Sequence, residues 1–332
     1  MNRSSFSRLL TAGAFALATL ASLPAQAGPF SALYVFGDSL SDNGNNAALL
    51  GINAAQVITG NTYVPSLPYA AGTYSNGFVW ANYFASALSL PLAPSLAGGG
   101  DFAFGGATTG AGSQLPSLLT QTGQYLGATG GVASADALYV IAGGGNNARA
   151  ALTAIGAQPA NALAIVAAAA ASFAADIGSM VDQLQAAGAQ HIVVWNTPNL
   201  GLAPAVAATG FGATGSFLAG AMNGALAARL TGEAGVSTFD LFGFGTQIAA
   251  NPAAFGFTNV TDACGAVANA NCSQYAYWDG IHPTTAAHLA IANAMVAVTV
   301  PIPEPETWAL MAFGLVAVAW GTRHRAKTAV AA

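Results

Sequence analysis

Two short stretches near opposite ends of the 332-residue chain carry the side chains best suited to chemistry. In the first, Gly37-Asp38-Ser39-Leu40 follows the apolar run of residues 33–36. This pattern indicates a buried strand that ends at the carboxyl edge of a parallel sheet, where α/β folds place their sites. A serine there becomes a useful nucleophile only beside a base that a third group orients. The alternative is a strand-to-helix turn with Ser39 as the N-cap.

Three histidines that precede the C-terminal tail are the candidate bases. His191 opens an apolar run and His288 lies within a helical pattern, so we expect both on the surface of the fold. His282 lies in a loop three residues after Asp279, and this spacing lets one loop present both side chains to the same pocket. The carboxylate would then fix the imidazole tautomer. The sequence therefore predicts a triad of Ser39, His282 and Asp279, and a structural turn capped by Asp279 is the competing interpretation.

Alternating apolar runs and helical patterns must position these residues. The predicted strands are residues 33–36, 101–104, 137–142, 191–195 and 236–241. The predicted helices are residues 79–88, 115–126, 160–187, 216–230 and 286–298. Such alternation predicts an α/β fold with a parallel sheet and right-handed crossovers. The sequence contains neither a dinucleotide fingerprint nor a P-loop.

Charge is scarce along the chain, which is 54% hydrophobic and 6% charged and has a net charge of −5. Between residues 28 and 303 the only Arg or Lys residues are Arg149 and Arg229, whereas all the acidic residues except Glu304 and Glu306 lie there. Such a surface lacks the basic patch that nucleic acid or anionic lipid requires, and it disfavours phosphate-rich substrates. Because the sequence has no Cys/His cluster, we expect neither a metal nor an organic cofactor.

The N-terminus has the pattern of an export signal. Arginines precede a short apolar run that ends in Ala-Gln-Ala at residues 25–27, which predicts a secretory signal over residues 1–27 rather than a membrane anchor. Two cysteines alone in an exported chain usually pair, so we expect a disulfide between Cys264 and Cys272. Two unpaired residues in a surface loop are the alternative.

The C-terminus has a second targeting pattern. A linker of Pro and Glu over residues 301–306 precedes an apolar span of residues 307–322, and basic residues follow it. Sixteen helical residues reach about 24 Å, slightly less than the roughly 30 Å hydrocarbon core. The basic end is typical of a cytoplasmic stop, and a buried last helix is the alternative. We therefore divide the chain into a signal (1–27), one domain (28–300) and a tail (301–332).

The domain resembles the SGNH/GDSL hydrolase family of secreted esterases and lipases over roughly residues 33–298. Four blocks carry the resemblance in the family's order: residues 37–45, 102–109, 144–147 and 279–282. The resemblance implies a three-layer α/β/α domain with a flavodoxin-like parallel sheet. It also implies that Ser39 is the nucleophile of a serine ester hydrolase, with His282 as its base and Asp279 as the orienting carboxylate.

The second and third blocks imply an oxyanion hole. Its donors would be the backbone N–H groups of Ser39 and Gly106 and the side-chain amide of Asn146, with Gly105 as the register alternative to Gly106. The family's third block is usually Gly-x-Asn-Asp, but this chain has Asn147 in place of the Asp. This departure concerns a supporting position, so it bears on loop packing more than on chemistry.

The tail resembles the PEP-CTERM sorting signal, which implies processing by an exosortase-like enzyme and transient anchoring in the inner membrane. We expect the mature protein at the cell surface or in the extracellular matrix of a Gram-negative bacterium, reached through the periplasm. The favoured function is a lipase or arylesterase that acts on apolar carboxylic esters. The alternatives are an esterase that removes acetyl groups from matrix polysaccharide and a non-catalytic surface- or matrix-binding module.

Overall fold

The computed structural model of the protein describes most of the predicted domain. The described residues are 29–50, 58, 61, 68–69, 71–110, 115–299 and 314–315. The predicted signal over residues 1–27 lies outside them. So does the predicted tail over residues 301–332, except residues 314 and 315.

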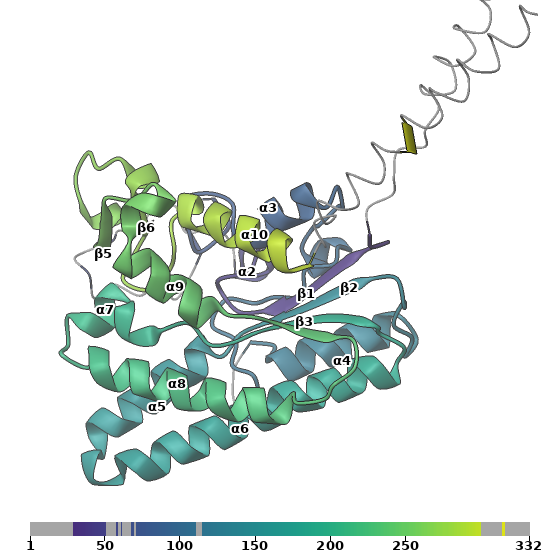
Figure 1. The fold of residues 1–332 in the computed structure, drawn as a ribbon, viewed down its shortest axis with the longest axis horizontal. Coiled ribbons are helices and arrows are strands. Elements are labelled where there is room, and N and C mark those ends of the chain that lie inside the picture. Colours follow the sequence, from purple (N-terminus) through teal and green to yellow (C-terminus); the bar gives the residue numbers. More distant parts are fainter. Residues whose placement is uncertain are drawn as a thin grey trace, which may run out of the picture.

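A parallel four-stranded sheet in the order β1-β2-β3-β4 forms the centre of the fold (Figure 1). Its strands are β1 (Leu33–Gly37), β2 (Leu138–Ala142), β3 (His191–Trp195) and β4 (Val236–Phe239). Residues 101–104, which the sequence predicts as a strand, form only a parallel bridge between Asp101 and Val35. The N–H of Phe102 also donates to the Val35 carbonyl. If this segment is counted as a strand, the order becomes 2-1-3-4-5, which is the expected flavodoxin-like order.

Helices cover both faces of this sheet, which confirms the expected three-layer architecture. In Figure 1, α4, α5, α6 and α8 lie on one side, and α3 and α10 lie on the other. The helices of the described part are α2 (Asn45–Leu50), α3 (Trp80–Ala87), α4 (Leu118–Ala128), α5 (Gly145–Ala157), α6 (Ala162–Ala186), α7 (Pro204–Ala207), α8 (Gly212–Arg229), α9 (Leu241–Ala250) and α10 (Thr285–Thr299).

The strands are apolar on both faces because each face packs against helices. Phe36 and Ile141 belong to the core with α4, α5, α6 and α8, whereas Val35 and Val140 belong to the core with α3 and α10. This alternation follows from the period of two in a strand. It gives the near-continuous apolar runs from which the sequence predicts strands.

Helix α6 forms from the alanine-rich stretch predicted as a long helix. Its stripe includes Phe173, Ile177 and Met180, all of which are buried in the core. Among the residues that the structure describes, Pro159–Ala186 is the one helical segment long and apolar enough to cross a membrane. Because its stripe packs into the core below the sheet, α6 serves here as a core helix.

A smaller unit after α9 supports the last part of the domain. Strands β5 (Asn259–Ala263) and β6 (Tyr275–Tyr277) pair with each other, and a disulfide joins Cys264 and Cys272 between them, as expected. The N–H of Gly265 donates to the Trp278 carbonyl at 2.9 Å. The disulfide segment is therefore tied to the residue immediately before Asp279.

Buried polar side chains hold the loops at the carboxyl edge of the sheet. Gln121 of α4 accepts a hydrogen bond from the Gly37 N–H at 2.8 Å and donates one to the Gly37 carbonyl at 2.9 Å. The carboxylate of Asp42 accepts N–H bonds from its own loop and, at 2.9 Å, from Gly105 of a distant loop. These bonds fix the end of β1 relative to the glycine segment that follows residues 101–104.

Asn147, the departure from the usual family pattern, completes a hydrogen-bonded chain. Its Oδ1 accepts the Thr109 N–H at 3.0 Å, and its Nδ2 donates to the Thr109 Oγ1 at 2.9 Å. The Thr109 hydroxyl in turn donates to Asp176 of α6 at 2.7 Å. A hydroxyl has one hydrogen and can serve only one carboxylate. Because Asp176 already accepts it, an amide is the group that fits at position 147.

We predict that Asn147→Asp destabilises the protein at pH 7. The new carboxylate would face the oxygen of Thr109, and the donor to that oxygen would be lost. We expect the free energy of unfolding to fall by about 1–3 kcal/mol, measured by chemical denaturation. The double change with Asp176→Asn should recover most of the loss, whereas Asp182→Asn on the same helix should not. Unchanged stability of Asn147→Asp would contradict this account.

Candidate active site

The structure brings together the three residues that the sequence predicts as a triad. The Oγ of Ser39 lies 2.7 Å from Nε2 of His282, and Nδ1 of His282 lies 2.7 Å from Oδ2 of Asp279. Ser39 follows β1, whereas Asp279 and His282 lie in the loop between β6 and α10. All three are buried, with exposed fractions of 8% for Ser39, 0% for Asp279 and 2% for His282.

The surroundings of Asp279 define the hydrogen positions on His282. Its Oδ1 accepts the N–H groups of Ile281 and His282, both at 2.7 Å, and its Oδ2 accepts the Tyr69 hydroxyl at 2.9 Å as well as the imidazole. Four donors therefore contact the two carboxylate oxygens of Asp279. Because a carboxylate only accepts, Nδ1 carries the imidazole hydrogen, and Nε2 is left to accept the hydrogen of the Ser39 hydroxyl.

The backbone N–H groups named for the oxyanion hole are free to bind a ligand. No acceptor among the described residues uses the N–H of Ser39 or of Gly106. The N–H of Gly105, by contrast, donates to Asp42. Gly106 has a φ of +86°, a conformation that glycine adopts without strain. Of the two glycines in register, Gly106 is therefore the one with an available donor.

Asn146 lies at the start of α5, directly beyond the end of β2. Its Nδ2 donates to the carbonyl of Ala107 at 2.9 Å, which leaves the second hydrogen of the amide unused. Asn146 and Ser39 line the same cavity. The bond to Ala107 links Asn146 to the residue after Gly106, so the structure places the three expected donors on adjoining segments.

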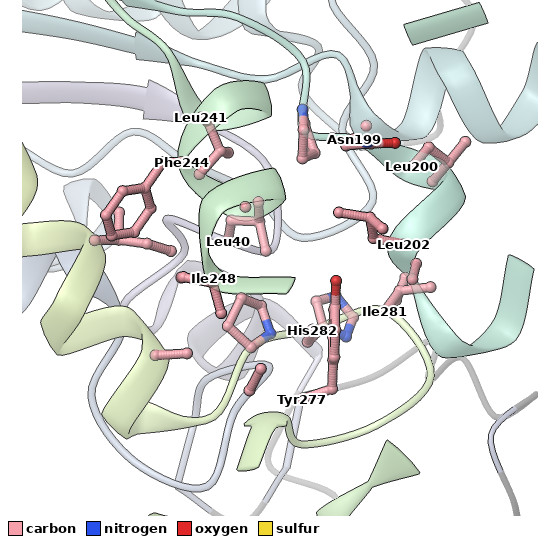
Figure 2. A pocket seen from close by; sticks show the side chains of 18 of the residues that line it. Leu40, Asn199, Leu200, Leu202, Leu241, Phe244, Ile248, Tyr277, Ile281 and His282 are labelled. Carbon is pink, nitrogen blue, oxygen red and sulfur yellow. The ribbon is translucent and has the colours of Figure 1, made fainter. Parts of the chain in front are cut away.

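An apolar cavity opens beside Ser39 and His282. Figure 2 shows Leu241, Phe244 and Ile248 of α9 on one side of it and Leu200, Leu202 and Ile281 on the other. Polar side chains are few in the lining and include those of Asn146, Arg149, Asn199 and Tyr277. The arrangement can therefore surround an apolar group next to the serine hydroxyl.

Burial shifts the titration of several groups around this cavity. It raises the pKa of Asp38 to about 6, although the Leu40 N–H and the charges of His282 and Arg149 oppose the shift. It lowers the pKa of Arg149, an effect opposed by the charges of Asp279 and Asp38. These shifts indicate a poorly solvated site in which charges interact strongly.

Of the other two histidines, both predicted on the surface, one is exposed and the other is buried. His191 opens β3 and is exposed, as predicted. The prediction that His288 lies on a helix surface is wrong, because His288 is fully buried in α10. Neither of its ring nitrogens has a hydrogen-bond partner within the described part of the chain, and burial lowers its pKa to about 3. His288 is therefore a neutral core residue.

Tyr69 and Arg149 are two polar residues of this site that the sequence does not predict. Tyr69 lies in the long segment between Ser39 and α3, where neither a motif nor a periodicity marks it. The sequence draws attention to Arg149 only because basic residues are scarce in the domain, and this scarcity could have indicated a role in the site. In the ranges that the structure describes, no group of three or more His, Cys, Asp or Glu side chains could hold a metal ion.

Three curated proteins show what the chain is similar to. An uncharacterised protein of the trpE–trpG intergenic region of Pseudomonas putida is 31% identical over 65% of this chain, and Lipase 1 of Photorhabdus luminescens is 32% identical over 53%. Acetylajmalan esterase 2 of Rauvolfia serpentina is 34% identical over 27%. The matched regions cover 37%, 24% and 29% of those three proteins, respectively, so this chain matches well under half of each.

Two family profiles divide the chain as the motifs do. The PEP-CTERM protein-sorting motif matches residues 301–325, and this signal indicates export in a Gram-negative bacterium. The profile of the GDSL-like lipase/acylhydrolase family matches residues 33–295, a range that runs from the first residue of β1 into α10. The match thus includes the whole sheet and both ends of the Ser39–His282–Asp279 arrangement, and the chain belongs to the GDSL-like lipase/acylhydrolase family.

Proposed function

We propose that the protein is a carboxylic ester hydrolase that acts through Ser39, His282 and Asp279. The observation that carries this proposal is the pair of 2.7 Å contacts that links the three side chains next to an apolar cavity. Ser39 attacks the ester carbonyl carbon while its proton passes to Nε2 of His282. His282 then returns that proton to the leaving alcohol, and an acyl-enzyme remains. Water, activated in the same way, releases the carboxylic acid.

The developing oxyanion would be bound by the N–H groups of Ser39 and Gly106 and by the Asn146 amide. The unused N–H groups and the free amide hydrogen support this assignment. Each such donor contributes about 3–4 kcal/mol to transition-state stabilisation. Asp279 acts by holding His282 in the required tautomer and by stabilising the imidazolium.

The walls of the cavity favour an aliphatic acyl group over an acetylated glycan. The side chains of α9 that face it are Leu241, Phe244 and Ile248. A sugar would require many polar partners there, whereas an acyl chain gains about 0.8 kcal/mol for each CH₂ that it buries. Relatives named as a lipase and an esterase support ester hydrolysis. A non-catalytic binding module would not need the buried hydrogen-bonded chain.

We also propose the processing of the two ends. Residues 1–27 would be removed as the signal, and residues 28–300 would form the mature hydrolase domain. Residues 301–332 would anchor the chain in the inner membrane until an exosortase-like enzyme cleaves near Pro303. The protein would then reside at the cell surface or in the matrix. The sorting motif at residues 301–325 supports this route.

Replacing the nucleophile tests the reaction directly. We predict that Ser39→Ala lowers kcat on p-nitrophenyl butyrate by about 10⁴-fold or more and abolishes labelling by a fluorophosphonate probe. The melting temperature should change little, because His282 is the one hydrogen-bond partner of the hydroxyl among the described residues. Ser237→Ala, on the exposed part of β4, is the control and should behave as the wild type. Turnover by Ser39→Ala above a few per cent of the wild-type value would contradict the assignment.

Asp279 and the Tyr69 hydroxyl that donates to it should contribute differently to kcat. We predict that Asp279→Asn lowers kcat by about 10³- to 10⁴-fold, because an amide can present the wrong group to Nδ1. Tyr69→Phe removes one of four donors to the same carboxylate and should cost less than about tenfold in kcat. Steady-state kinetics of both variants gives the comparison. A loss below tenfold in Asp279→Asn would show that its role is structural.

Chain-length preference tests the role of the cavity. We predict that kcat/KM rises from acetyl to octanoyl p-nitrophenyl esters. A Cβ at Gly245, which lines the cavity on α9, meets no atom within 4 Å, so Gly245→Phe should fold and narrow the cavity. It should depress octanoyl hydrolysis at least tenfold more than acetyl hydrolysis. Gly224→Phe, an exposed glycine of α8 with equal space, is the control. A uniform effect on both esters would count against an acyl cavity.

A further inference from the structure

Arg149 is a half-buried charge that forms no ion pair with any carboxylate of the described residues. It lies on α5 three residues after Asn146 and lines the cavity beside Ser39. It also lines a second hollow on the other side of Ile281. The ion pairs found among the described residues involve other groups: Arg229 with Asp182 and Glu233, and His282 with Asp279. The charges of Asp279 and Asp38 offset part of the cost of burying this guanidinium. Burying a charge without an ion-pair partner is still costly, so its placement requires a reason.

The contacts of the Asn146 amide supply that reason. Nη1 of Arg149 donates to Oδ1 of Asn146 at 3.3 Å, while Nδ2 of Asn146 donates to the Ala107 carbonyl at 2.9 Å. A flipped amide would set its oxygen against the Ala107 carbonyl and its NH₂ group against the guanidinium. Both contacts would then be repulsive. Arg149 and Ala107 together therefore allow one orientation, and in it the second hydrogen of Nδ2 is left for a ligand.

We propose that Arg149 is a positioning residue for the oxyanion site: it holds the Asn146 amide as a donor and polarises it as negative charge develops on the substrate. The inference rests on the proposed function of Asn146. A donor whose oxygen accepts from a cation is strengthened, and the effect is larger in a poorly solvated cavity. No carboxylate of the described residues forms an ion pair with Arg149, so its Nη1 can donate to the Asn146 amide.

A double-mutant cycle of Arg149 and Asn146 tests this role in the full-length protein. Arg149→Met keeps an unbranched stem and the helix propensity but removes the guanidinium, and with it the charge and the donor. We expect it to lower kcat on p-nitrophenyl butyrate by about tenfold or more with KM within about twofold, as expected when only the transition state loses an interaction. Arg149→Lys should recover part of the loss. In the background of Asn146→Ala, Arg149→Met should have little further effect, because its route of action is already removed.

Two controls separate this role from a structural one. Arg229→Met removes the other arginine of the domain and should leave kcat unchanged. The inhibition constant of a trifluoromethyl ketone, which forms an oxyanion on Ser39, should rise in Arg149→Met in proportion to the loss of kcat/KM. A lowered melting temperature alone would not produce that proportion, because the folded fraction binds with its own affinity.

Several outcomes would overturn the inference. If the losses from Arg149→Met and Asn146→Ala multiply, Arg149 acts independently of the amide. If KM rises for esters with an anionic leaving group and kcat is unchanged, Arg149 binds the substrate instead. Wild-type kcat in Arg149→Met refutes this inference alone and leaves the proposed function intact. The absence of Ser39-dependent hydrolysis in the wild-type protein refutes both.

Discussion

The buried carboxylate of Asp42 is the constraint on which the candidate site depends. It gathers the N–H groups of residues 44–46 and that of Gly105, so the loop after Ser39 and the loop that contains Gly106 are held by one side chain. Burial raises the pKa of Asp42, and these backbone donors oppose that shift. Ser39, the proposed nucleophile, and Gly106, a proposed oxyanion donor, therefore lie on two loops that the Asp42 side chain connects.

Charged residues are few around the cavity, as they are in the chain as a whole. A chain with so few ionised groups offers little that could compete with or neutralise a charge in the cavity. Arg149 and Asp38 line it, and both have pKa values shifted by burial. Apolar residues of α9 and the segment around Leu202 form the rest of the wall. The same composition thus provides an apolar space for the proposed acyl group. It also provides poorly solvated surroundings in which the charge of a single guanidinium acts strongly.

The sequence predicts best the features that a short local pattern of residues determines. The apolar runs of residues 137–142 and 191–195 predicted two strands, because a short and nearly continuous apolar run is typical of a strand that packs against helices on both faces. The spacing of Asp279 and His282 placed both on one loop. The sequence does not predict helix α5, because its first residues are Gly and Asn, which have a low helix propensity. Tertiary packing outweighs that low propensity in the folded protein. Tyr69 could not be predicted, since its role depends on a contact with Asp279 across 210 residues.

The separation between Ser39 and His282 has a consequence for how the site forms. Their hydrogen bond closes a loop of 243 residues, so it joins the first strand of the domain to the segment before its last helix. The entropy cost of such a closure grows only as the logarithm of loop length, but it must be met before the contact contributes anything. High contact order of this kind slows folding. We therefore expect the contact between Ser39 and His282 to form late in folding, so that the proposed hydrolysis would report on completion of the whole domain rather than of any single part.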